Sequence, residues 1–275
     1  MTANKTVLIT GVSSGIGLAT ARLLTSRGFQ VFGTTRSSDL KSPVPGLKMI
    51  RLDVTDEAAV RQGVQSVLKQ AGHLDGLINN AGYMLIGGLE ETSVAEAQQQ
   101  FDANFFGVVR MTNAALPAMR ERGRGRIVNI GSVLGFLPGP YMGMYAATKH
   151  AIAGYTETLD HEVRQFGVRA VLVEPSFTNS NLGSNGQVVS ATLEAYGDQR
   201  ARVTAAIQRN LERGSDPHDV AEVVYEALTA QPPRLRYPVG ESALLGRLRR
   251  FLPARLFETS FRKRFHLEDA PASTT

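Results

Sequence analysis

Tyr145 and Lys149 are spaced four residues apart in the run GMYAATKHA, whose residue types favour a helix. Helical positions i and i+4 share one face, so the two side chains are able to reach the same pocket. A free phenol has a pKa of about 10, which is too high for proton transfer near neutral pH, and a nearby positive charge favours its ionised form. The pair is therefore a candidate acid/base. By spacing alone, a partly buried ring beside a lysine that keeps its ammonium in water is the commoner arrangement.

A glycine-rich turn follows the first apolar run of the chain, in the segment ITGVSSGIG. Gly11, Gly15 and Gly17 come after a predicted strand and open a predicted helix. At such a turn the backbone is able to approach a pyrophosphate closely, and the helix N-terminus favours an anion. The spacing G-x-x-x-G-x-G departs from the dinucleotide fingerprint G-x-G-x-x-G. A tight turn without any ligand is the alternative interpretation.

Short apolar runs alternate with longer amphipathic runs along the chain. The apolar runs, which are typical of buried parallel strands, span residues 6–10, 30–35, 48–52, 76–79, 126–130 and 169–174, with a last one at 235–239. The helical patterns span about residues 15–27, 56–70, 94–122 and 144–166. This alternation predicts an α/β fold with a doubly wound parallel sheet between two layers of helices. No repeat or Pro/Gly-rich linker divides the sequence.

Two segments depart from this alternation. Residues 177–214 carry no strand pattern and begin with Ser, Asn and Gly residues, which predicts a mobile loop with short helices beside a site. Residues 243–267 are amphipathic and basic, and Pro253 would divide this stretch into two helices. We therefore expect a dinucleotide-binding catalytic domain over residues 1–240, followed by a basic C-terminal extension over residues 241–275.

Several short motifs follow one another along about the first two thirds of the chain. They are T-G-x-x-x-G-I-G (Thr10, Gly11, Gly15, Ile16, Gly17), N-N-A-G (Asn79, Asn80, Ala81, Gly82), a helix asparagine (Asn104), a serine after the fifth strand (Ser132) and Y-x-x-x-K (Tyr145, Lys149). In this order they resemble the short-chain dehydrogenase/reductase family. The stretches GYTETLDHEVRQFGV and VEPSFTNSNL are most similar to its branch of hydroxysteroid and retinol dehydrogenases.

The resemblance implies a Rossmann-type fold in a single domain and an oxidoreductase that uses NAD(P). It implies that Tyr145 donates a proton to a carbonyl or takes one from an alcohol, while hydride passes to or from the nicotinamide. Ser132 would hold the substrate oxygen, Lys149 would also bind the nicotinamide ribose, and Asn104 would keep an ordered water beside the lysine. Taken singly, Ser132 is equally compatible with capping a turn, and Asn104 with bonding to backbone at a helix bend.

The end of the second predicted strand, FGTTRSSD, indicates which dinucleotide binds. An acidic residue there bonds the ribose 2′-hydroxyl of NAD, whereas an arginine accommodates the 2′-phosphate of NADP. Thr35 takes the place of the acid, Arg36 follows it and Ser13 adds a hydroxyl, so we expect NADP(H) in preference to NAD(H). Arg36 as a solvated surface charge is the alternative. Asp53 resembles the residue that reads the adenine amino group.

The family's P-G-x-x-x-T turn after the sixth strand is replaced here by Pro175, Ser176 and Ser180. Serine keeps the hydroxyl of the threonine, but Ser176 adopts a positive φ less readily than glycine. The full set of cofactor contacts that the resemblance implies is Gly11, Ser13, Ser14, Gly15, Ile16, Gly17, Thr35, Arg36, Asp53, Val54, Asn80, Ala81, Gly82, Tyr145, Lys149, Pro175 and Ser180.

The residues that the resemblance places at the mouth of the substrate pocket are apolar or aromatic. They are Leu134, Phe136, Tyr141, Met142, Phe177 and Leu182. No arginine is among them to bind a carboxylate or phosphate, which favours an apolar carbonyl compound or secondary alcohol. Sterol-like, retinoid-like, aromatic and aliphatic substrates stay open, as does the direction of the reaction.

Composition and charge limit the other function classes. The 275 residues include no cysteine, which excludes disulfides and thiolate sites, and the formal net charge is +5. No His, Asp and Glu spacing predicts a metal site, so His150 and His161 fit surface or packing roles. We expect a cytoplasmic protein without a membrane-spanning helix or a nucleic-acid partner. Peripheral membrane contact through residues 244–265 is one interpretation of the basic C-terminal segment, and packing over the substrate loop or against a neighbouring subunit is the alternative. Relatives imply a homodimer or homotetramer, and a nicotinamide-binding regulator without turnover is the alternative to an enzyme.

Overall fold

The computed structural model describes residues 5–179 and 186–267. Within these residues, seven strands form one parallel sheet in the order β3-β2-β1-β4-β6-β7-β9. The strands are β1 (Thr6–Ile9), β2 (Gln30–Thr35), β3 (Lys48–Arg51), β4 (Gly76–Asn79), β6 (Gly125–Ile130), β7 (Val168–Pro175) and β9 (Arg236–Val239). The strand order reverses beside β1, which confirms the doubly wound sheet expected from the sequence.

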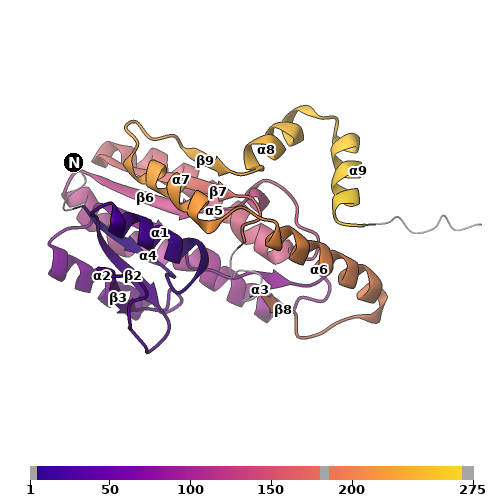
Figure 1. The fold of residues 1–275 in the computed structure, drawn as a ribbon, viewed down its shortest axis with the longest axis horizontal. Coiled ribbons are helices and arrows are strands. Elements are labelled where there is room, and N and C mark those ends of the chain that lie inside the picture. The colour runs from indigo at the N-terminus through magenta and orange to yellow at the C-terminus, as the bar shows by residue number, and fades with distance from the viewer. Residues whose placement is uncertain (1–4, 180–185, 268–275) are drawn as a thin grey trace, which may run out of the picture.

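Helices cover both faces of this sheet (Figure 1). One face carries α1 (Gly15–Ser26) and α7 (Pro217–Thr229), and the other carries α2 (Glu57–Ala71), α4 (Gly107–Glu121) and α5 (Gly143–Val163). Successive strand residues point to opposite faces, so Val7 and Ile9 lie in the first apolar core while Leu8 lies in the second. The two cores give the three-layer α/β architecture.

Local polar residues set where several of these helices begin and end. The Asp56 carboxylate accepts hydrogen bonds from the backbone N–H groups of Ala58 and Ala59 and caps α2, which ends at Gly72 in the left-handed conformation. The α3 helix (Val94–Phe101) begins with a capping box in which Ser93 and Glu96 bond to each other's backbone. Such caps satisfy backbone groups that have no partner within the helix.

Residues 94–122, expected as one helix, form three consecutive pieces. A π-helical turn at Asp102–Phe106 separates α3 from α4. Asn104 lies in this turn with 1% of its surface exposed. Turns of this kind are frequent at functional sites. Apolar periodicity does not show the one extra residue that widens a helical turn, so the expectation of a continuous helix is wrong at this point.

The segment expected as a loop with short helices contains more regular structure. A short strand, β8 (Gln187–Val188), pairs in parallel with β5 (Leu85–Ile86), and α6 (Gly197–Glu212) is 16 residues long. The expectation of short helices is therefore wrong for α6. Its sequence carries a buried apolar stripe that explains the helix: Val203, Ala206, Ile207 and Leu211.

Two helices follow the last strand and project beyond the end of the sheet (Figure 1). They are α8 (Ser242–Phe251) and α9 (Ala254–Arg264), and Pro253 lies between them. The division at Pro253 that the sequence predicts is confirmed. Phe265, directly after α9, is 2% exposed and belongs to an apolar cluster that also contains Ile207 and Leu211 of α6.

Candidate active site

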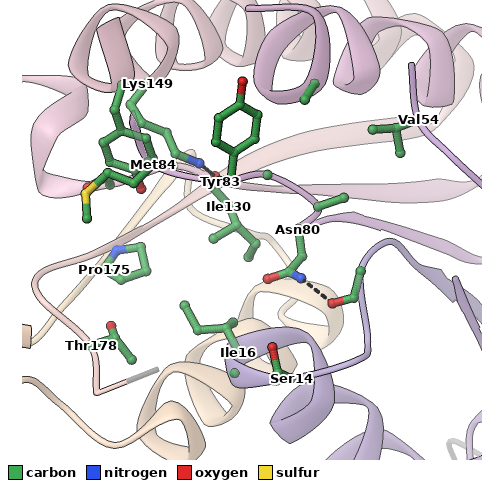
Figure 2. A pocket seen from close by; sticks show the side chains of 18 of the residues that line it. Ser14, Ile16, Val54, Asn80, Tyr83, Met84, Ile130, Lys149, Pro175 and Thr178 are labelled. Carbon is green, nitrogen blue, oxygen red and sulfur yellow. Dashed lines mark hydrogen bonds between the residues drawn. The ribbon is translucent and has the colours of Figure 1, made fainter. Parts of the chain in front are cut away.

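One pocket runs along the carboxyl ends of the central strands, from the glycine turn to the segment after β7. Figure 2 shows Ser14 and Ile16 on one side of it and Lys149 and Met84 on another, with Pro175 between them. Open parallel sheets bind ligands at the point where the strand order reverses, because the neighbouring connections leave the sheet in opposite directions there. The fold therefore brings these side chains together at the place where a dinucleotide binds in such sheets.

The glycine turn has the backbone that a close phosphate contact needs. Gly11 and Gly15 line the pocket with φ angles of +72° and +56°, which side chains rarely adopt. A Cβ atom at Gly17 would overlap the carbonyl oxygen of Gly11 and lie 2.5 Å from the Asn80 amide nitrogen. Within the described residues Gly17 does not line the pocket. The lack of a side chain at Gly17 instead lets the start of α1 pack closely against Gly11 and Asn80.

Thr10 and Asn80 join this turn to the end of β4. The Thr10 hydroxyl accepts hydrogen bonds from the backbone N–H groups of Asn80 and Ala81, each at 2.9 Å. The Asn80 amide donates to the carbonyl oxygens of Thr10 and Gly11, each at 2.9 Å. Asn80 lies beside the turn in Figure 2 with one of its hydrogen bonds drawn. These bonds fix the turn that Asn80, Ala81 and Gly82 border, and all three residues line the pocket.

The end of β2 forms the polar corner of the pocket. The Ser13 and Thr35 hydroxyl groups lie 3.0 Å apart, and the Thr35 hydroxyl also accepts a hydrogen bond from the Ser37 N–H at 3.1 Å. Arg36 is exposed to solvent and lines the pocket beside them. Asp53 and Val54 line the next part of the wall. The glycine cradle and this group of hydroxyls and a guanidinium fit a phosphorylated dinucleotide.

Ser132, Tyr145 and Lys149 meet on the opposite side of the pocket. Ser132 follows β6, and its hydroxyl accepts a hydrogen bond from the Leu134 N–H at 3.1 Å, so it does cap a turn. The Ser132 side chain also lowers the pKa of the Tyr145 phenol. The Lys149 ammonium donates to the Ile130 carbonyl oxygen at 2.7 Å. Consecutive turns of α5 thus present a phenol and a buried ammonium to one cavity.

Burial, more than the neighbouring charge, controls both titrations. Desolvation raises the pKa of Tyr145 to about 12, and the Ser132 side chain opposes that rise. Desolvation also lowers the pKa of Lys149 to about 8. The net shift of the Tyr145 pKa is upward, because desolvation of the phenolate outweighs the effect of Ser132, and the influence of the Lys149 charge on the phenol stays a prediction.

Asn104 acts on the backbone next to the pocket. Its side-chain oxygen accepts from the Tyr83 N–H at 3.0 Å, and its amide donates to the Tyr83 carbonyl oxygen at 2.9 Å and to the Thr148 hydroxyl at 3.3 Å. These contacts match the alternative of an asparagine bonded to backbone at a helix bend. Among the described residues Asn104 is not part of the pocket lining, since these bonds turn its amide toward Tyr83. Any role toward a water beside Lys149 stays a prediction.

The segment after β7 approaches the same cavity. Pro175 and Ser176 line it, and the Ser176 N–H donates to the Val239 carbonyl oxygen at 3.2 Å. Tyr141 and His266 are the non-glycine residues with positive φ in the described part of the chain, so Ser176 does not need the conformation that glycine favours. Ser180 and Leu182, both predicted contacts, lie outside the described residues.

The far end of the pocket has an apolar wall. Three predicted substrate residues line it, namely Leu134, Met142 and Phe177. Within the described residues Phe136 and Tyr141 do not, and this part of the expectation needs correction. Both belong to the same apolar cluster as the wall residues Leu134, Met142 and Phe177, and the Tyr141 hydroxyl donates to the Gln199 side chain of α6 at 2.9 Å.

Several lining residues were not singled out from the sequence. Tyr83 and Met84 follow directly on the N-N-A-G motif, and this adjacency was a signal that could have identified them. Burial raises the pKa of Tyr83, which the nearby Arg36 charge opposes. Thr178 and Leu211 also line the cavity; Thr178 occupies an unspecified position of the P-G-x-x-x-T pattern, and the segment of Leu211 gave no motif.

The described part of the chain contains no group of three or more histidine and acidic side chains placed to hold a metal ion. It also contains no helix with the length and apolar character needed to cross a membrane. Both histidines of α5 are exposed, and the His150 ring contacts the Ala146 carbonyl oxygen at 2.9 Å.

Comparison with known sequences gives a consistent match. The sequence model described as "short chain dehydrogenase" matches residues 5–187. A 3-ketodihydrosphingosine reductase of Bacteroides thetaiotaomicron is 35% identical over 260 residues, covering 93% of this chain and 96% of the relative. Retinol dehydrogenase 8 of Bos taurus is 35% identical over 256 residues, covering 85% of this chain and 81% of the relative.

Solved structures match the fold over most of its length. A short-chain dehydrogenase from Streptomyces avermitilis has a TM-score of 0.79 at 35% identity, covering 94% of this chain and 97% of that structure. ElxO with NADP bound has a TM-score of 0.74 at 26% identity, covering 88% and 99%. A short-chain dehydrogenase/reductase from Burkholderia phymatum in complex with NAD has a TM-score of 0.79 at 25% identity, covering 98% and 99%.

Proposed function

This chain belongs to the short-chain dehydrogenase family, and we propose that it transfers hydride between NADP(H) and an apolar carbonyl compound or its secondary alcohol. Like its relatives, it is an oxidoreductase that acts on alcohol or keto groups with NAD(P). The observation that carries the proposal is that Ser132, Tyr145 and Lys149 line one pocket, with the Lys149 ammonium 5.5 Å from the centre of the Tyr145 ring. These residues lie where the polar part of the pocket meets its apolar wall.

The three side chains have separate roles in the proposed reaction. When bound, the nicotinamide cofactor supplies or accepts the hydride. A phenol with a pKa of about 12 is protonated at neutral pH, so Tyr145 is in the form that donates a proton to a carbonyl oxygen. Ser132 donates a hydrogen bond to the same oxygen, where negative charge develops. The buried Lys149 ammonium stabilises the phenolate that proton donation leaves on Tyr145.

The preference for NADP(H) rests on the polar corner at the end of β2. Solved relatives bind NADP in one case and NAD in another, so family membership supports a nicotinamide cofactor without selecting one. Here β2 ends in Thr35 where an NAD enzyme carries an acid, and Arg36 follows it on the pocket wall. The Ser13 hydroxyl beside Thr35 adds a further partner for a phosphate.

The apolar wall supports an apolar substrate. Its side chains carry no formal charge to bind a carboxylate or phosphate: Met84, Val133, Leu134, Met142, Phe177 and Leu211. Two relatives are a 3-ketodihydrosphingosine reductase and a retinol dehydrogenase. The compound in each name is a long, largely apolar molecule. We propose a long-chain or polyene ketone, or the corresponding secondary alcohol, as the substrate class, and the panel below includes aldehydes to test this limit.

A substrate panel tests this proposal. The panel pairs 3-ketodihydrosphingosine, retinal and shorter aliphatic and aromatic ketones with NADPH and NADH, and turnover is followed by the absorbance of the reduced nicotinamide. We expect NADPH oxidation with apolar ketones and little with carboxylated ones of equal length. Tight NADPH binding with no turnover across the panel would contradict the enzyme and favour a nicotinamide-binding regulator without turnover.

We also propose that the chain forms a homodimer or homotetramer. The end of α3, the π-helical turn and α5 carry an aromatic group whose rings contact each other edge to face: Phe101, Phe105, Phe106 and Tyr155. Phe106 is 48% exposed, which leaves part of this group for a second copy to cover. Light scattering at micromolar concentration tests the assembly, and a monomer there contradicts it.

A further inference from the structure

We propose that α8 and α9 bind the surface of an anionic lipid bilayer. The C-terminal patch consists of exposed apolar side chains and arginines on these two helices and their junction. Its apolar members are Leu244, Phe251, Leu252 and Leu256, and its basic members are Arg247, Arg249, Arg250 and Arg255. Helices that combine these two kinds of residue lie in the interface of a membrane, with the apolar side chains in the headgroup region.

Exposed apolar residues are concentrated in this patch. Eleven large hydrophobic side chains are exposed in the described part of the chain, and four of them fall within residues 244–256. Phe251 is the most exposed of the eleven, at 76%. Leu244 and Phe251 are seven residues apart in α8, which places them on one face of the helix. A concentration of this kind on a water-facing surface marks an interaction site.

The charge of the patch selects an anionic partner. The four arginines lie in a stretch without any acidic residue, from Ser242 to Phe257. None of the four forms an ion pair with a side chain of residues 5–179 or 186–267. Each basic residue near an anionic bilayer contributes about 1 kcal/mol to binding, or about fivefold in affinity. Anionic lipid headgroups complement this charge.

A second copy of the chain is a poorer occupant of the same patch. In a two-fold symmetric contact the same surface meets itself, so the arginines of one copy would face those of the other. Like charges at close range oppose association. The patch also differs from the aromatic group on the π-helical turn and α5, where a second copy is expected.

The other side of α9 connects the patch to the apolar end of the pocket. Phe257, Phe261 and Phe265 pack in one apolar cluster with Leu211 of α6, and Leu211 also lines the pocket. A bilayer at the patch therefore lies next to the elements that form the apolar wall. This gives an apolar substrate dissolved in the bilayer a short path to the site. Only this consequence rests on the proposed function, because binding to the bilayer needs no turnover.

Vesicle flotation with the full chain tests the proposal. One set of vesicles contains phosphatidylcholine alone, and the other contains equal parts of phosphatidylcholine and phosphatidylglycerol. We expect binding to the anionic set that falls steeply as salt rises, and little binding to the neutral set. Arg249→Glu with Arg250→Glu, and separately Phe251→Ser with Leu256→Ser, should each lower the partition coefficient by at least about tenfold.

Matched control variants change other surfaces in the same way. Arg61→Glu with Lys69→Glu reverses two exposed charges on α2, and Val94→Ser removes an apolar side chain that is 74% exposed. These controls should keep wild-type partitioning, and thermal unfolding should show that every variant is folded. Equal binding to both vesicle sets, equal loss in controls and patch variants, or no binding by the wild-type chain would each overturn the proposal. So would a patch variant that changes the oligomer size without changing vesicle binding.

Discussion

The Lys149 ammonium lies 5.5 Å from the centre of the Tyr145 ring while it donates its hydrogen bond to the carbonyl oxygen of Ile130. The lysine is thereby held as a positive charge beside the ring, and Ser132 is the side chain that lowers the pKa of the phenol. The phenol stays protonated and the charge stays close by. This division of roles leads to different consequences for the loss of each residue.

Tyr145→Phe should remove the proton donor and leave the packing nearly intact, because it deletes one hydroxyl from a buried ring. We expect kcat to fall by about 10² to 10⁴, the range for a lost general acid, with NADPH affinity nearly unchanged. Steady-state kinetics and cofactor titration measure the two quantities.

Tyr155→Phe is the matched control, since Tyr155 lies on the same helix and packs against Phe105. It should turn over at close to the wild-type rate. Wild-type turnover by Tyr145→Phe would remove the tyrosine from the chemistry.

The pKa of Lys149 predicts how reduction depends on pH. Burial lowers this pKa to about 8, so the ammonium that stabilises the Tyr145 phenolate is lost as pH rises through that value. We expect kcat/KM for reduction to fall above about pH 8. Lys149→Arg, whose guanidinium stays protonated, should be slower but should not show this fall. A fall that persists in Lys149→Arg would assign the titration to another group.

The same pKa has the opposite effect on stability. Between about pH 8 and the ordinary lysine pKa, the unfolded chain binds a proton at Lys149 that the folded chain has lost, so the free energy of unfolding rises with pH. In denaturant titrations, the unfolding free energy of the wild type minus that of Lys149→Met should therefore increase as pH rises over this window. Falling activity together with rising relative stability distinguishes loss of the ammonium from alkaline unfolding.

Gly17→Ala should disturb the nucleotide end of the pocket. The added methyl group would overlap the Gly11 carbonyl oxygen and press on the Asn80 amide, so α1 or the turn must move. We expect weaker binding of NADPH and a lower melting temperature. Gly197→Ala is the control, because a Cβ at this first position of α6 meets nothing within 4 Å. If both variants bind NADPH equally well, the close packing at Gly17 does not contribute to cofactor binding.

The sequence predicted the parts of the fold that periodicity encodes. Short β-branched runs marked the seven strands of the sheet to within one or two residues, since buried parallel strands are apolar throughout. The π-helical turn at Asp102–Phe106 was missed because one inserted residue hardly changes an apolar pattern. The α6 helix was missed because polar residues at the start of its segment concealed the stripe of Val203, Ile207 and Leu211.

Pocket residues that belong to a sequence motif were predicted correctly, and pocket residues outside the motifs were predicted less well. Gly11 and Gly15 of the glycine turn, with Ser132, Tyr145 and Lys149, line the pocket, because short motifs fix both their types and their place near strand ends. Phe136 and Tyr141 are not among the described residues that line the pocket, since an apolar side chain next to a motif is able to face either the cavity or the core. The raised pKa of Tyr145 depends on its depth of burial, which no spacing in the sequence measures.

The choice between the two cofactors is tested at Arg36 and Thr35. Arg36 is exposed at the polar corner, so its guanidinium contributes to binding only if it meets the 2′-phosphate. Arg36→Ala should weaken NADPH by about tenfold to a hundredfold and leave NADH nearly unchanged, because only NADPH carries that phosphate.

Two further variants separate a direct contact from a general effect of charge. Lys41→Ala removes an exposed positive charge from the same loop, and it should change both affinities little. Thr35→Asp should act in the opposite sense to the arginine, since a carboxylate accepts a hydrogen bond from the NAD ribose hydroxyl and repels the phosphate. Affinities for all variants come from fluorescence titration of each reduced cofactor. If Arg36→Ala weakened NADPH and NADH equally, the residue would serve the adenosine moiety that both share, and the preference for NADP(H) would lose its physical basis.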